Sequence, residues 1–421
     1  MTATLLETAL EKVQGTPVPQ VKKIALAYSG GLDSALCTVL AREKYGAEEL
    51  VAIMVDIGQG DEELQAGLQK ATALDIEPIV LDVKDEFSEG WLKKAIQANV
   101  DYNGYPCSTS MTRQLIAAVV AQKAVELGCD ALMEGSTGKG NDQYRMHNVF
   151  TLFAPGLEIL VPVRDFDLTR QEEMALCEHY GVPVTEVLVG GDDKTMWCRS
   201  IASGGIGLDT ELPDDVWLWL TPPRKAPDEP TVLTLTFEAG VPVAVNGQRL
   251  PLKELIPLLN ELGGKNGIGK IDMWEDGIMD LKSREIYEAP AAQIILKLHR
   301  DLEGWCLTKD EVVFKKQVDG RWSSLVYHGE WFHPLRADLD AFIARTQEVV
   351  NGEYTVSLYK GNIDILKRHS DSGLFAPEIR AITSASFNQQ LCGPAAQIRG
   401  LPYEVLAKRN ARRGTTLATS E

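Results

Sequence analysis

The 421-residue sequence is poor in cysteine and has no long hydrophobic run. Its seven cysteines are an odd number, and no two of them form a CxxC pair. This pattern favours reduced thiols over a disulfide framework or a zinc site. No apolar run reaches membrane-spanning length, and the first residues, MTATLLETALEKV, carry acidic side chains where a signal peptide carries basic ones. We therefore expect a cytoplasmic protein without a membrane partner.

Basic residues are also outnumbered by acidic ones, which gives a formal net charge of −18. A surface of this sign repels the phosphate backbone of nucleic acids, so we expect no nucleic-acid partner. Hydrophobic residues at 44% and charged residues at 24% are typical of soluble globular enzymes. A chain of 421 residues is too long for a single hydrophobic core, which predicts two or more domains.

Two common phosphate-binding loops are absent, since the sequence has neither GxxxxGK[ST] nor a GxGxxG turn after a strand. It has instead SGGLDS, residues 29–34, between an apolar strand at 24–27 and a helix that we expect from Asp33 onward. Two glycines allow a ligand to approach the backbone, and the first N–H groups of a helix have no internal acceptors. The segment therefore predicts a phosphate site, with Asp33 placed to hold a divalent ion.

Short apolar strands alternate with helices between about residues 21 and 185. This order predicts an α/β fold, a doubly wound and mostly parallel sheet covered by helices on both faces. Ligands of such sheets bind beyond the carboxyl ends of the strands. Three motifs fall there: SGGLDS, DIGQG at 56–60, and GSTGKGND from residue 135.

Other segments predict further parts of the chain. Residues 1–20 form an N-terminal extension, and 21–185 form the nucleotide-binding domain. Alternating polar and apolar residues predict a second, α+β domain at 186–383, with a turn at Glu275 to Gly277. Residues 384–421 predict a C-terminal arm with a basic helix, a candidate for gripping another subunit.

The segment GSTGKGNDQYRM, residues 135–146, carries the second group of candidate binding residues. Thr137, Asn141, Asp142 and Arg145 offer a hydroxyl, an amide, a carboxylate and a guanidinium within nine positions. These groups suit an amino acid, whose carboxylate needs donors and whose ammonium needs acceptors. Asn141 and Asp142 are also expected to cap the helix that follows.

In this order and spacing, SGGLDS, DIGQG and TGKGNDQ resemble the argininosuccinate synthase family, and SGGLDS resembles the pyrophosphate loop of ATP pyrophosphatases. The resemblance runs from about residue 21 to 413 and includes YPCSTSMTR at 105–113, WCRSI at 197–201 and NGIGKIDMWEDGIMDLKSREIYEAP at 266–290. It implies a HUP-like nucleotide-binding domain, followed by a synthetase and multimerisation domain. The implied activity joins L-citrulline and L-aspartate to give argininosuccinate, through a citrulline-adenylate, with release of AMP and pyrophosphate. It further implies ATP as a substrate, Mg²⁺ with ATP, and a homotetramer.

The resemblance also implies roles for individual residues. Those expected at ATP are Ala27, Tyr28, Ser29, Gly30, Gly31, Leu32, Asp33, Ser34, Val55 and Gly135. Those expected at aspartate are Ser136, Thr137, Asn141 and Asp142. Those expected at citrulline are Tyr105, Ser110, Asn141, Arg145, Ser200, Glu275 and Tyr287. Asp33, Asp142 and Arg145 are the expected catalytic residues, and no set of metal ligands is identified.

The chain departs from the family pattern at a few positions. Ser34 stands where the family has Thr, and Gly191 stands where the family has a Ser that contacts citrulline. A related ligase that joins aspartate to a different ureido or amide acceptor is therefore the alternative. A tRNA-modifying enzyme with a pyrophosphate loop is a second alternative, but it would show a basic face and often paired cysteines, and the sequence indicates neither. A catalytically dead scaffold is a third, but it would not need Gly30, Gly31, Asp33 or Arg145, all of which are present.

Overall fold

The computed structural model describes residues 2–183, 193–203, 207–277 and 279–414. The chain forms two compact units, Met1–Gly373 and Leu374–Glu421. Gly191, which bears on the choice of acceptor, lies outside the described residues.

The first unit contains the predicted parallel sheet. Its five strands lie in the order β3-β2-β1-β4-β5, and every neighbouring pair is parallel. The strands are β1 (Lys23–Ala27), β2 (Glu49–Asp56), β3 (Ile79–Asp82), β4 (Ala131–Met133) and β5 (Glu158–Leu160). The expected α/β fold with a doubly wound parallel sheet is thus confirmed. The strand order reverses between β1 and β4, which is the position where open α/β sheets bind ligands.

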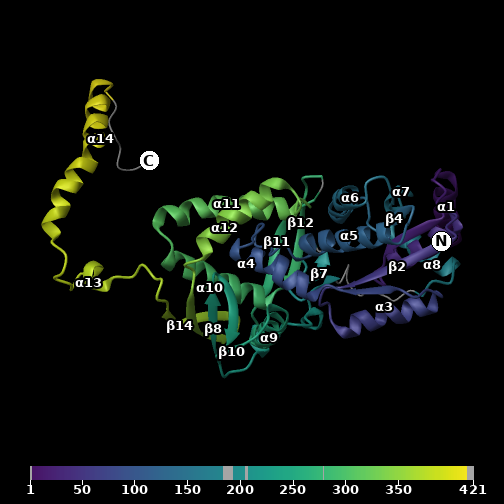
Figure 1. Cartoon of the computed structure of the whole chain (residues 1–421), viewed down its shortest axis with the longest axis horizontal. Helices are drawn as coiled ribbons and strands as arrows, with labels where there is room; N and C mark the ends of the chain where they lie inside the picture. The colour runs from purple at the N-terminus through teal and green to yellow at the C-terminus, as the bar shows by residue number, and fades with distance from the viewer. Residues whose placement is uncertain (1, 184–192, 204–206, 278, 415–421) are drawn as a thin grey trace. The chain divides into compact units, whose positions relative to one another are not determined.

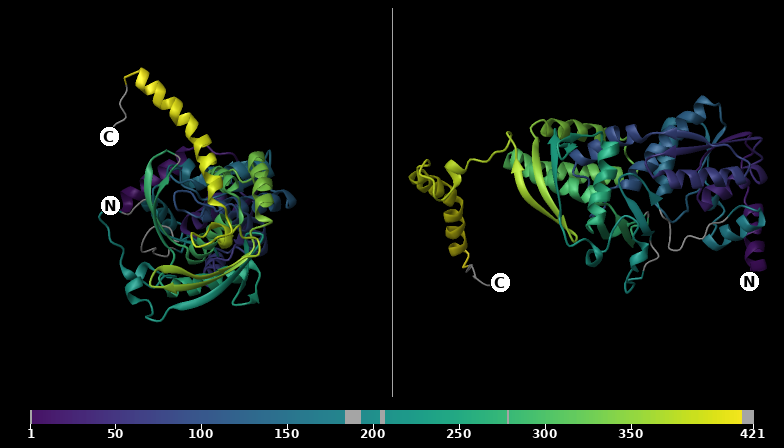
Figure 2. Two further views of the ribbon diagram at one scale, coloured as in Figure 1. Left: turned by 90° about the vertical axis from the view of Figure 1, so that its left-hand side faces the viewer. Right: turned by 90° about the horizontal axis from the view of Figure 1, so that it is seen from below.

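Helices cover both faces of this sheet (Figures 1 and 2). The helices in this part of the chain are α1 (Thr2–Gly15), α2 (Leu32–Glu43), α3 (Asp61–Ala73), α4 (Lys93–Gln97), α5 (Ser108–Glu126), α6 (Asp142–Phe153), α7 (Pro162–Asp165) and α8 (Arg170–His179). Alternate strand residues enter different hydrophobic cores, since Ala25 and Ile53 pack with α5, whereas Ile24 and Met54 pack with α2 and α8. This period of two is the expected pattern for a strand buried on both faces.

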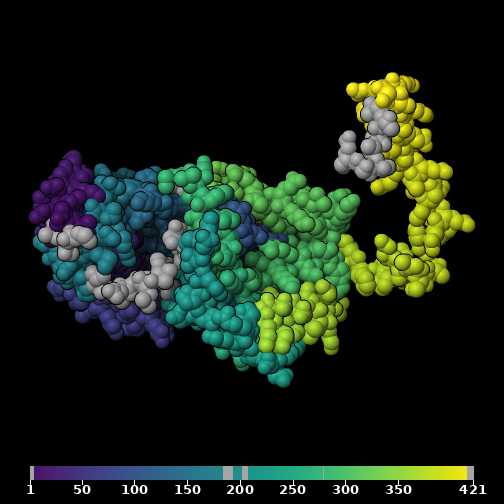
Figure 3. Space-filling view, turned by 180° about the vertical axis from the view of Figure 1, so that it is seen from behind, coloured from purple at the N-terminus to yellow at the C-terminus, as the bar shows by residue number. Residues whose placement is uncertain are grey.

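The remainder of the first unit carries two antiparallel sheets and four long helices among its described residues. One sheet has the order β10-β9-β8-β13-β14 and the other β11-β12-β7-β6. Their strands are β6 (Asp193–Lys194), β7 (Arg199–Ser203), β8 (Thr231–Glu238), β9 (Val241–Val245), β10 (Gln248–Arg249), β11 (Lys270–Asp276), β12 (Lys282–Glu288), β13 (Gly352–Tyr359) and β14 (Asn362–His369). The helices include α9 (Leu252–Lys265), α10 (Pro290–Cys306), α11 (Lys309–Tyr327) and α12 (Pro334–Gln347). Figure 3 shows β13 and β14, in yellow-green, on the same surface as the teal strands β8 to β10.

The two predicted domains share one hydrophobic core, because the cluster that contains α5 continues into α9, α10 and the strands β8 and β13. A buried polar group also joins them. Lys315 on α11 is 1% exposed and forms ion pairs with Glu303 and Asp319, and Asn99 donates to both carboxylates. This contact fixes the parallel sheet against the helices of the second part. The expected boundary near residue 185 stays a prediction.

A π-helical turn, η1 (Glu86–Leu92), directly precedes α4. One local expectation was wrong. The turn expected at Glu275 to Gly277 starts later, because Glu275 and Asp276 still pair with Ser283 and Lys282 in the β11–β12 ladder. Glu275 therefore has a fixed strand position rather than a place in a loop.

The second unit contains α13 (Pro377–Arg380), the 3₁₀ turn η4 (Gln389–Leu391) and α14 (Cys392–Arg412). No residue of α14 is buried within this unit. Large apolar side chains exposed here include Phe375, Ile382, Leu391, Ile398 and Tyr403. Apolar surface of this extent on an extended arm is typical of a segment that packs against a partner chain. Among the described residues, no helix has the length and apolar character needed to span a bilayer.

Candidate active site

A cavity of about 1260 Å³ opens at the carboxyl ends of β1, β2 and β4. The loop after β1 and the loop after β4 form neighbouring walls, since β1 and β4 are paired strands. The two loops touch directly: a Cβ atom built on Gly135 would lie 2.9 Å from the Cβ of Asp33. The two glycine-containing motifs singled out in the sequence therefore open onto one cavity, which is large enough for a nucleotide together with a second small molecule.

The SGGLDS loop binds its own backbone tightly. The Ser29 hydroxyl accepts from the Gly31 amide at 3.2 Å, and the Ser34 hydroxyl accepts from the Ser29 amide at 3.3 Å and donates to the Gly31 carbonyl at 3.1 Å. Gly30 adopts a φ of +77°, and a Cβ there would lie 2.5 Å from the Cα of Gly67 on α3. Only glycine at both positions allows this close approach. No side chain caps the N-terminus of α2, which leaves its amides available to an anion.

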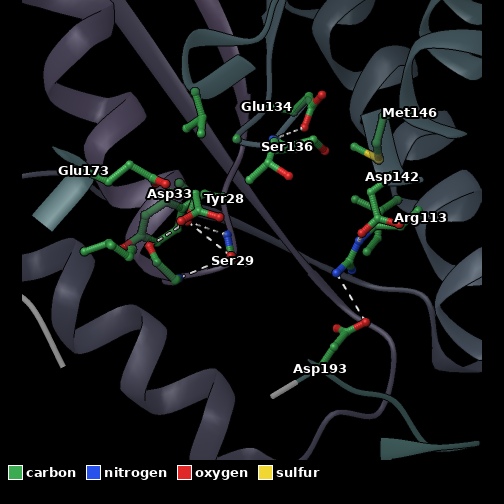
Figure 4. A pocket seen from close by; sticks show the side chains of 18 of the residues that line it. Tyr28, Ser29, Asp33, Arg113, Glu134, Ser136, Asp142, Met146, Glu173 and Asp193 are labelled. Atoms are coloured by element: carbon green, nitrogen blue, oxygen red, sulfur yellow. Dashed lines mark hydrogen bonds and ion pairs between the residues drawn. The ribbon is translucent and has the colours of Figure 1, made fainter. Parts of the chain in front are cut away.

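Asp33, in the SGGLDS loop, faces α8 across one end of the cavity. It forms an ion pair with Arg170, and Glu173 lies beside it (Figure 4). Burial together with the neighbouring Asp33 charge raises the pKa of Glu173 above its ordinary value. Lys70 on α3 donates to the Gly30 carbonyl at 2.9 Å and also lines the cavity. The loop is thus surrounded by cations that suit phosphate oxygens.

The loop after β4 turns into α6, and Asp142 is the first residue of this helix. Its carboxylate accepts from Nε of Arg113 at 2.9 Å and from Nη1 of Arg145 at 3.0 Å. Burial acts to raise the pKa of Asp142, but the two guanidinium groups outweigh it and hold this pKa below its ordinary value. Asp142 is therefore a fixed anion at the cavity wall. Figure 4 shows Arg113 between Asp142 and Asp193.

Arg145, the ion-pair partner of Asp142, belongs to a buried polar cluster. Its residues come from α5 and the segment before it, from α6 and α11, and from the strands β11 and β12. The Tyr105 ring stacks on the Tyr287 ring at a centroid distance of 4.5 Å, and the Tyr287 hydroxyl donates to Glu275 at 3.3 Å. The Arg145 guanidinium lies 5.0 Å from the ring centroid of Tyr327, whose carbonyl accepts from Arg145 Nε. Burial raises the pKa of Glu275 to about 7. The cluster is therefore a desolvated site in which unpaired charge is costly.

Three polar atoms of this cluster are buried and have no hydrogen-bond partner among the described residues: Ser110 Oγ, Asn141 Oδ1 and Arg145 Nη2. Each such atom costs roughly 1 to 3 kcal/mol in a folded protein. They are a hydroxyl, a carbonyl acceptor and a guanidinium donor. The most direct physical reason for retaining them is a polar ligand that completes their hydrogen bonds.

The structure divides the residues expected from the sequence into two sets. Those that line the cavity are Ala27, Tyr28, Ser29, Gly31, Leu32, Asp33, Ser34, Val55, Gly135, Ser136, Thr137 and Asp142. Those outside its lining are Gly30, Tyr105, Ser110, Asn141, Arg145, Ser200, Glu275 and Tyr287. Gly30 acts through packing on α3, and Ser200 lies opposite Tyr287 in the β7–β12 ladder. The expected capping role of Asn141 was wrong, because its side chain makes no capping hydrogen bond although it stands at the N-cap position of α6; its amide nitrogen donates to the Tyr327 hydroxyl at 3.0 Å.

Sequence reasoning missed several residues at the site: Lys70, Arg113, Glu134, Arg164, Arg170, Glu173 and Tyr327. Most lie on helices distant in sequence from the two glycine-containing motifs. A single charged residue on a helix does not indicate a binding site by itself. Glu134 is different, because a carboxylate at the carboxyl end of a buried strand, beside a glycine loop, is itself a recognisable pattern. Tyr327 closes the buried cluster and donates to the Asp276 carbonyl at 2.7 Å.

Comparisons with known proteins agree with this geometry. Residues 23–183 match the family described as arginosuccinate synthase N-terminal HUP domain, and residues 192–406 match the arginosuccinate synthase C-terminal domain. The chain is 41% identical over 396 residues to an argininosuccinate synthase from Methanopyrus kandleri, covering 92% of this chain and 100% of that protein. It is 42% identical over 385 residues to the argininosuccinate synthase of Pyrococcus furiosus, covering 90% and 93%, respectively. It is 40% identical over 391 residues to that of Methanosarcina acetivorans, covering 92% and 99%. The chain belongs to the argininosuccinate synthase family.

Proposed function

We propose that the protein is a carbon–nitrogen ligase that condenses L-citrulline with L-aspartate in arginine biosynthesis, using ATP and releasing AMP and pyrophosphate. Family membership carries the activity, and one observation carries the placement of the substrates. An open cavity with a phosphate loop adjoins a buried cluster in which three polar atoms have no hydrogen-bond partner among the residues described. Asp142 connects the two regions because it lines the cavity and also pairs with Arg145.

ATP lies in the cavity along Ala27 to Ser34, with Val55 near the adenosine and Gly135 offering its backbone. The amides of α2 and the Lys70 ammonium support this assignment, since both favour phosphate oxygens. Aspartate lies against Ser136, Thr137, Asn141 and Asp142, where a fixed carboxylate meets its ammonium.

Citrulline occupies the buried cluster. Its carboxylate takes the unpaired Nη2 of Arg145, and its ammonium takes Glu275 and the Asn141 carbonyl. Its remaining contacts are to Tyr105, Ser110, Ser200 and Tyr287. This arrangement directs the ureido oxygen toward the cavity, where the α-phosphate of ATP lies. Adenylation converts that oxygen into a leaving group, and positioning of the three substrates supplies most of the catalysis.

Mg²⁺ accompanies ATP in this proposal. The described residues contain no group of three or more His, Cys, Asp or Glu side chains able to hold a metal. A single carboxylate at the phosphate loop fits an ion held mainly by phosphate oxygens and water, and Asp33 is that carboxylate. The ion supplies neutralisation of phosphate charge.

The C-terminal arm supports assembly into a homotetramer, because its apolar side chains are exposed within its own unit. We place the enzyme in the cytoplasm, since all the described cysteines are free thiols.

The test measures two reactions with purified full-length protein. The first is exchange of labelled pyrophosphate into ATP with citrulline and without aspartate, which reports adenylation. The second is formation of AMP and argininosuccinate with all three substrates. We expect exchange that depends on citrulline and product formation that depends on aspartate. Strong aspartate-dependent AMP formation with another ureido or amide compound, and little with citrulline, would instead identify the alternative acceptor.

A further inference from the structure

Glu134 lies at the carboxyl end of β4, one residue before the loop assigned to aspartate. Its side chain lines the cavity although only 4% of the residue is exposed. One carboxylate oxygen accepts from the Ser136 amide at 2.6 Å, which orients the group (Figure 4). The next residue, Gly135, touches Asp33 of the phosphate loop. Glu134 is thus held between the phosphate loop and the segment assigned to aspartate.

The carboxyl of Glu134 is buried without an ion-pair partner among the described residues. The charged or titratable groups facing it are Asp142 from α6, Arg164 from α7 and the Cys37 thiol from α2. Burial raises the pKa of Glu134 to about 7, while the hydrogen bonds from Ser136 and the Arg164 charge act in the opposite direction. A carboxyl with this pKa exchanges protons readily near neutral pH.

The proposed reaction needs such a group. Aspartate binds as an ammonium ion, which has no lone pair and cannot attack carbon. Asp142, the carboxylate assigned to this ammonium, is tied to Arg113 and Arg145, and its lowered pKa makes it a poor proton acceptor. Glu134 lines the same cavity without this restraint.

Resting on the proposed function, we propose that Glu134 is the general base that accepts a proton from the aspartate ammonium. The freed amine lone pair then forms the C–N bond to the amidine carbon of the citrulline-adenylate. The bond between this carbon and the oxygen that bridges to the phosphate breaks, and its electron pair leaves on that oxygen as part of AMP. The second proton lost from the aspartate nitrogen leaves with the AMP phosphate, so that the product carries the guanidinium charge. Glu134 returns its proton to water when the products leave.

The test separates adenylation from ligation in Glu134→Gln, which keeps the shape but not the base. We expect aspartate-dependent ligation to fall about 10²- to 10⁴-fold, while citrulline-dependent pyrophosphate exchange stays within a fewfold of the unsubstituted enzyme. The ligation rate of the unsubstituted enzyme, measured in a single turnover, should rise with pH and level off as Glu134 ionises. This rise should be absent in Glu134→Gln. Glu158→Gln, at the exposed start of the neighbouring strand β5, is the charge-matched control.

A bypass experiment tests the base directly. Hydroxylamine is a small nucleophile that is largely uncharged at pH 7, so it should consume the citrulline-adenylate equally fast in the enzyme with and without Glu134→Gln. Equal loss of exchange and ligation, or loss of the hydroxylamine reaction, would overturn the proposal and indicate a structural or adenylation role. Unimpaired ligation in Glu134→Gln would also overturn it. Absence of citrulline-dependent exchange in the unsubstituted enzyme would refute the proposed function itself.

Discussion

The cavity and the buried cluster differ in how complete they are without substrates. The phosphate loop satisfies its own serine hydroxyls and is framed by the paired charges of Asp33 and Arg170. In the buried cluster, in contrast, Ser110, Asn141 and Arg145 each have a polar atom without a hydrogen-bond partner in the part of the chain that the structure describes. Under the proposed function, a nucleotide would bind to a surface that is stable alone, whereas the amino acid would complete a site that is energetically incomplete. Loss of a side chain should accordingly be felt more strongly, and more selectively, in the cluster.

The largest effect should follow Arg145→Ala. Arg145 is 4% exposed, and truncating a desolvated, hydrogen-bonded charge costs about 2 to 5 kcal/mol. We expect the citrulline KM from initial-rate kinetics to rise about 30-fold to several thousand-fold, with the ATP dissociation constant nearly unchanged. Arg336→Ala, which removes an 8%-exposed arginine paired with Asp340 on α12, controls for general loss of a buried ion pair. Comparable weakening of ATP and citrulline would contradict the separation of the two regions.

Asp142→Asn should show an intermediate effect, since Asp142 belongs to both regions. The change keeps the shape but removes the anion shared by Arg113 and Arg145. Hydrogen bonds to charged groups contribute about 1.5 to 3 kcal/mol, so we expect the aspartate KM to rise roughly 10- to 150-fold. Citrulline should weaken less, and ATP least, in the same kinetic experiment. Asp319→Asn, on α11 beside Lys315, reports the effect of neutralising a buried acid elsewhere. Equal weakening of all three substrates would assign Asp142 a folding role.

The difference between the two regions also explains what could be predicted from the sequence. The SGGLDS loop lies within six consecutive residues after a buried strand, so strand, turn and helix signals all coincide. Its position at the edge of a parallel sheet followed from the alternation of strands and helices, and both expectations are confirmed by the order β3-β2-β1-β4-β5. Local chemistry was sufficient for this half of the site.

The buried cluster could not be assembled in this way. Asn141 and Arg145 were candidates from their own segment, but only the family resemblance named members as distant as Tyr105 and Tyr287. The misplaced turn at Glu275 shows the reason, because the length of β11 is set by its pairing with β12 rather than by local residues. Asn141 was likewise expected to cap α6 with its side chain. That side chain instead contacts a distant helix, because its amide nitrogen donates to the Tyr327 hydroxyl. Tyr327 itself carried no signal, since its partners are 51 and 186 residues away.

A smaller and more selective effect is expected for Tyr327→Phe. The Tyr327 hydroxyl accepts from Asn141 and donates to the Asp276 carbonyl, so its loss removes one partner of the Asn141 amide, which keeps its 3.3 Å hydrogen bond to the Asp276 carbonyl, while the ring stays in place. One such hydrogen bond contributes about 0.5 to 1.5 kcal/mol, which corresponds to a roughly 2- to 12-fold rise in the citrulline KM. Tyr354→Phe removes a buried hydroxyl bound to Asp301 away from the site and should leave kinetics unchanged. An altered ATP KM in Tyr327→Phe would show that the two regions are coupled.

The smallest effect should appear at the opposite end of the site, in Lys12→Met. Helix α1, which precedes the residues matched by the family, packs on α8 and donates from Lys12 to Glu172 and to the Asp167 carbonyl at 3.0 and 2.7 Å. The same segment carries Arg170, the ion-pair partner of Asp33. A partly exposed ion pair contributes about 0.2 to 1 kcal/mol, so we expect at most a fivefold rise in the ATP KM, with citrulline unaffected. Lys253→Met, which removes a lysine of similar exposure from its pair with the exposed Asp85, should change neither KM. If the citrulline KM rose as much as the ATP KM, α1 would stabilise the whole unit. Support limited to α8 would affect only the part of the site next to the SGGLDS loop.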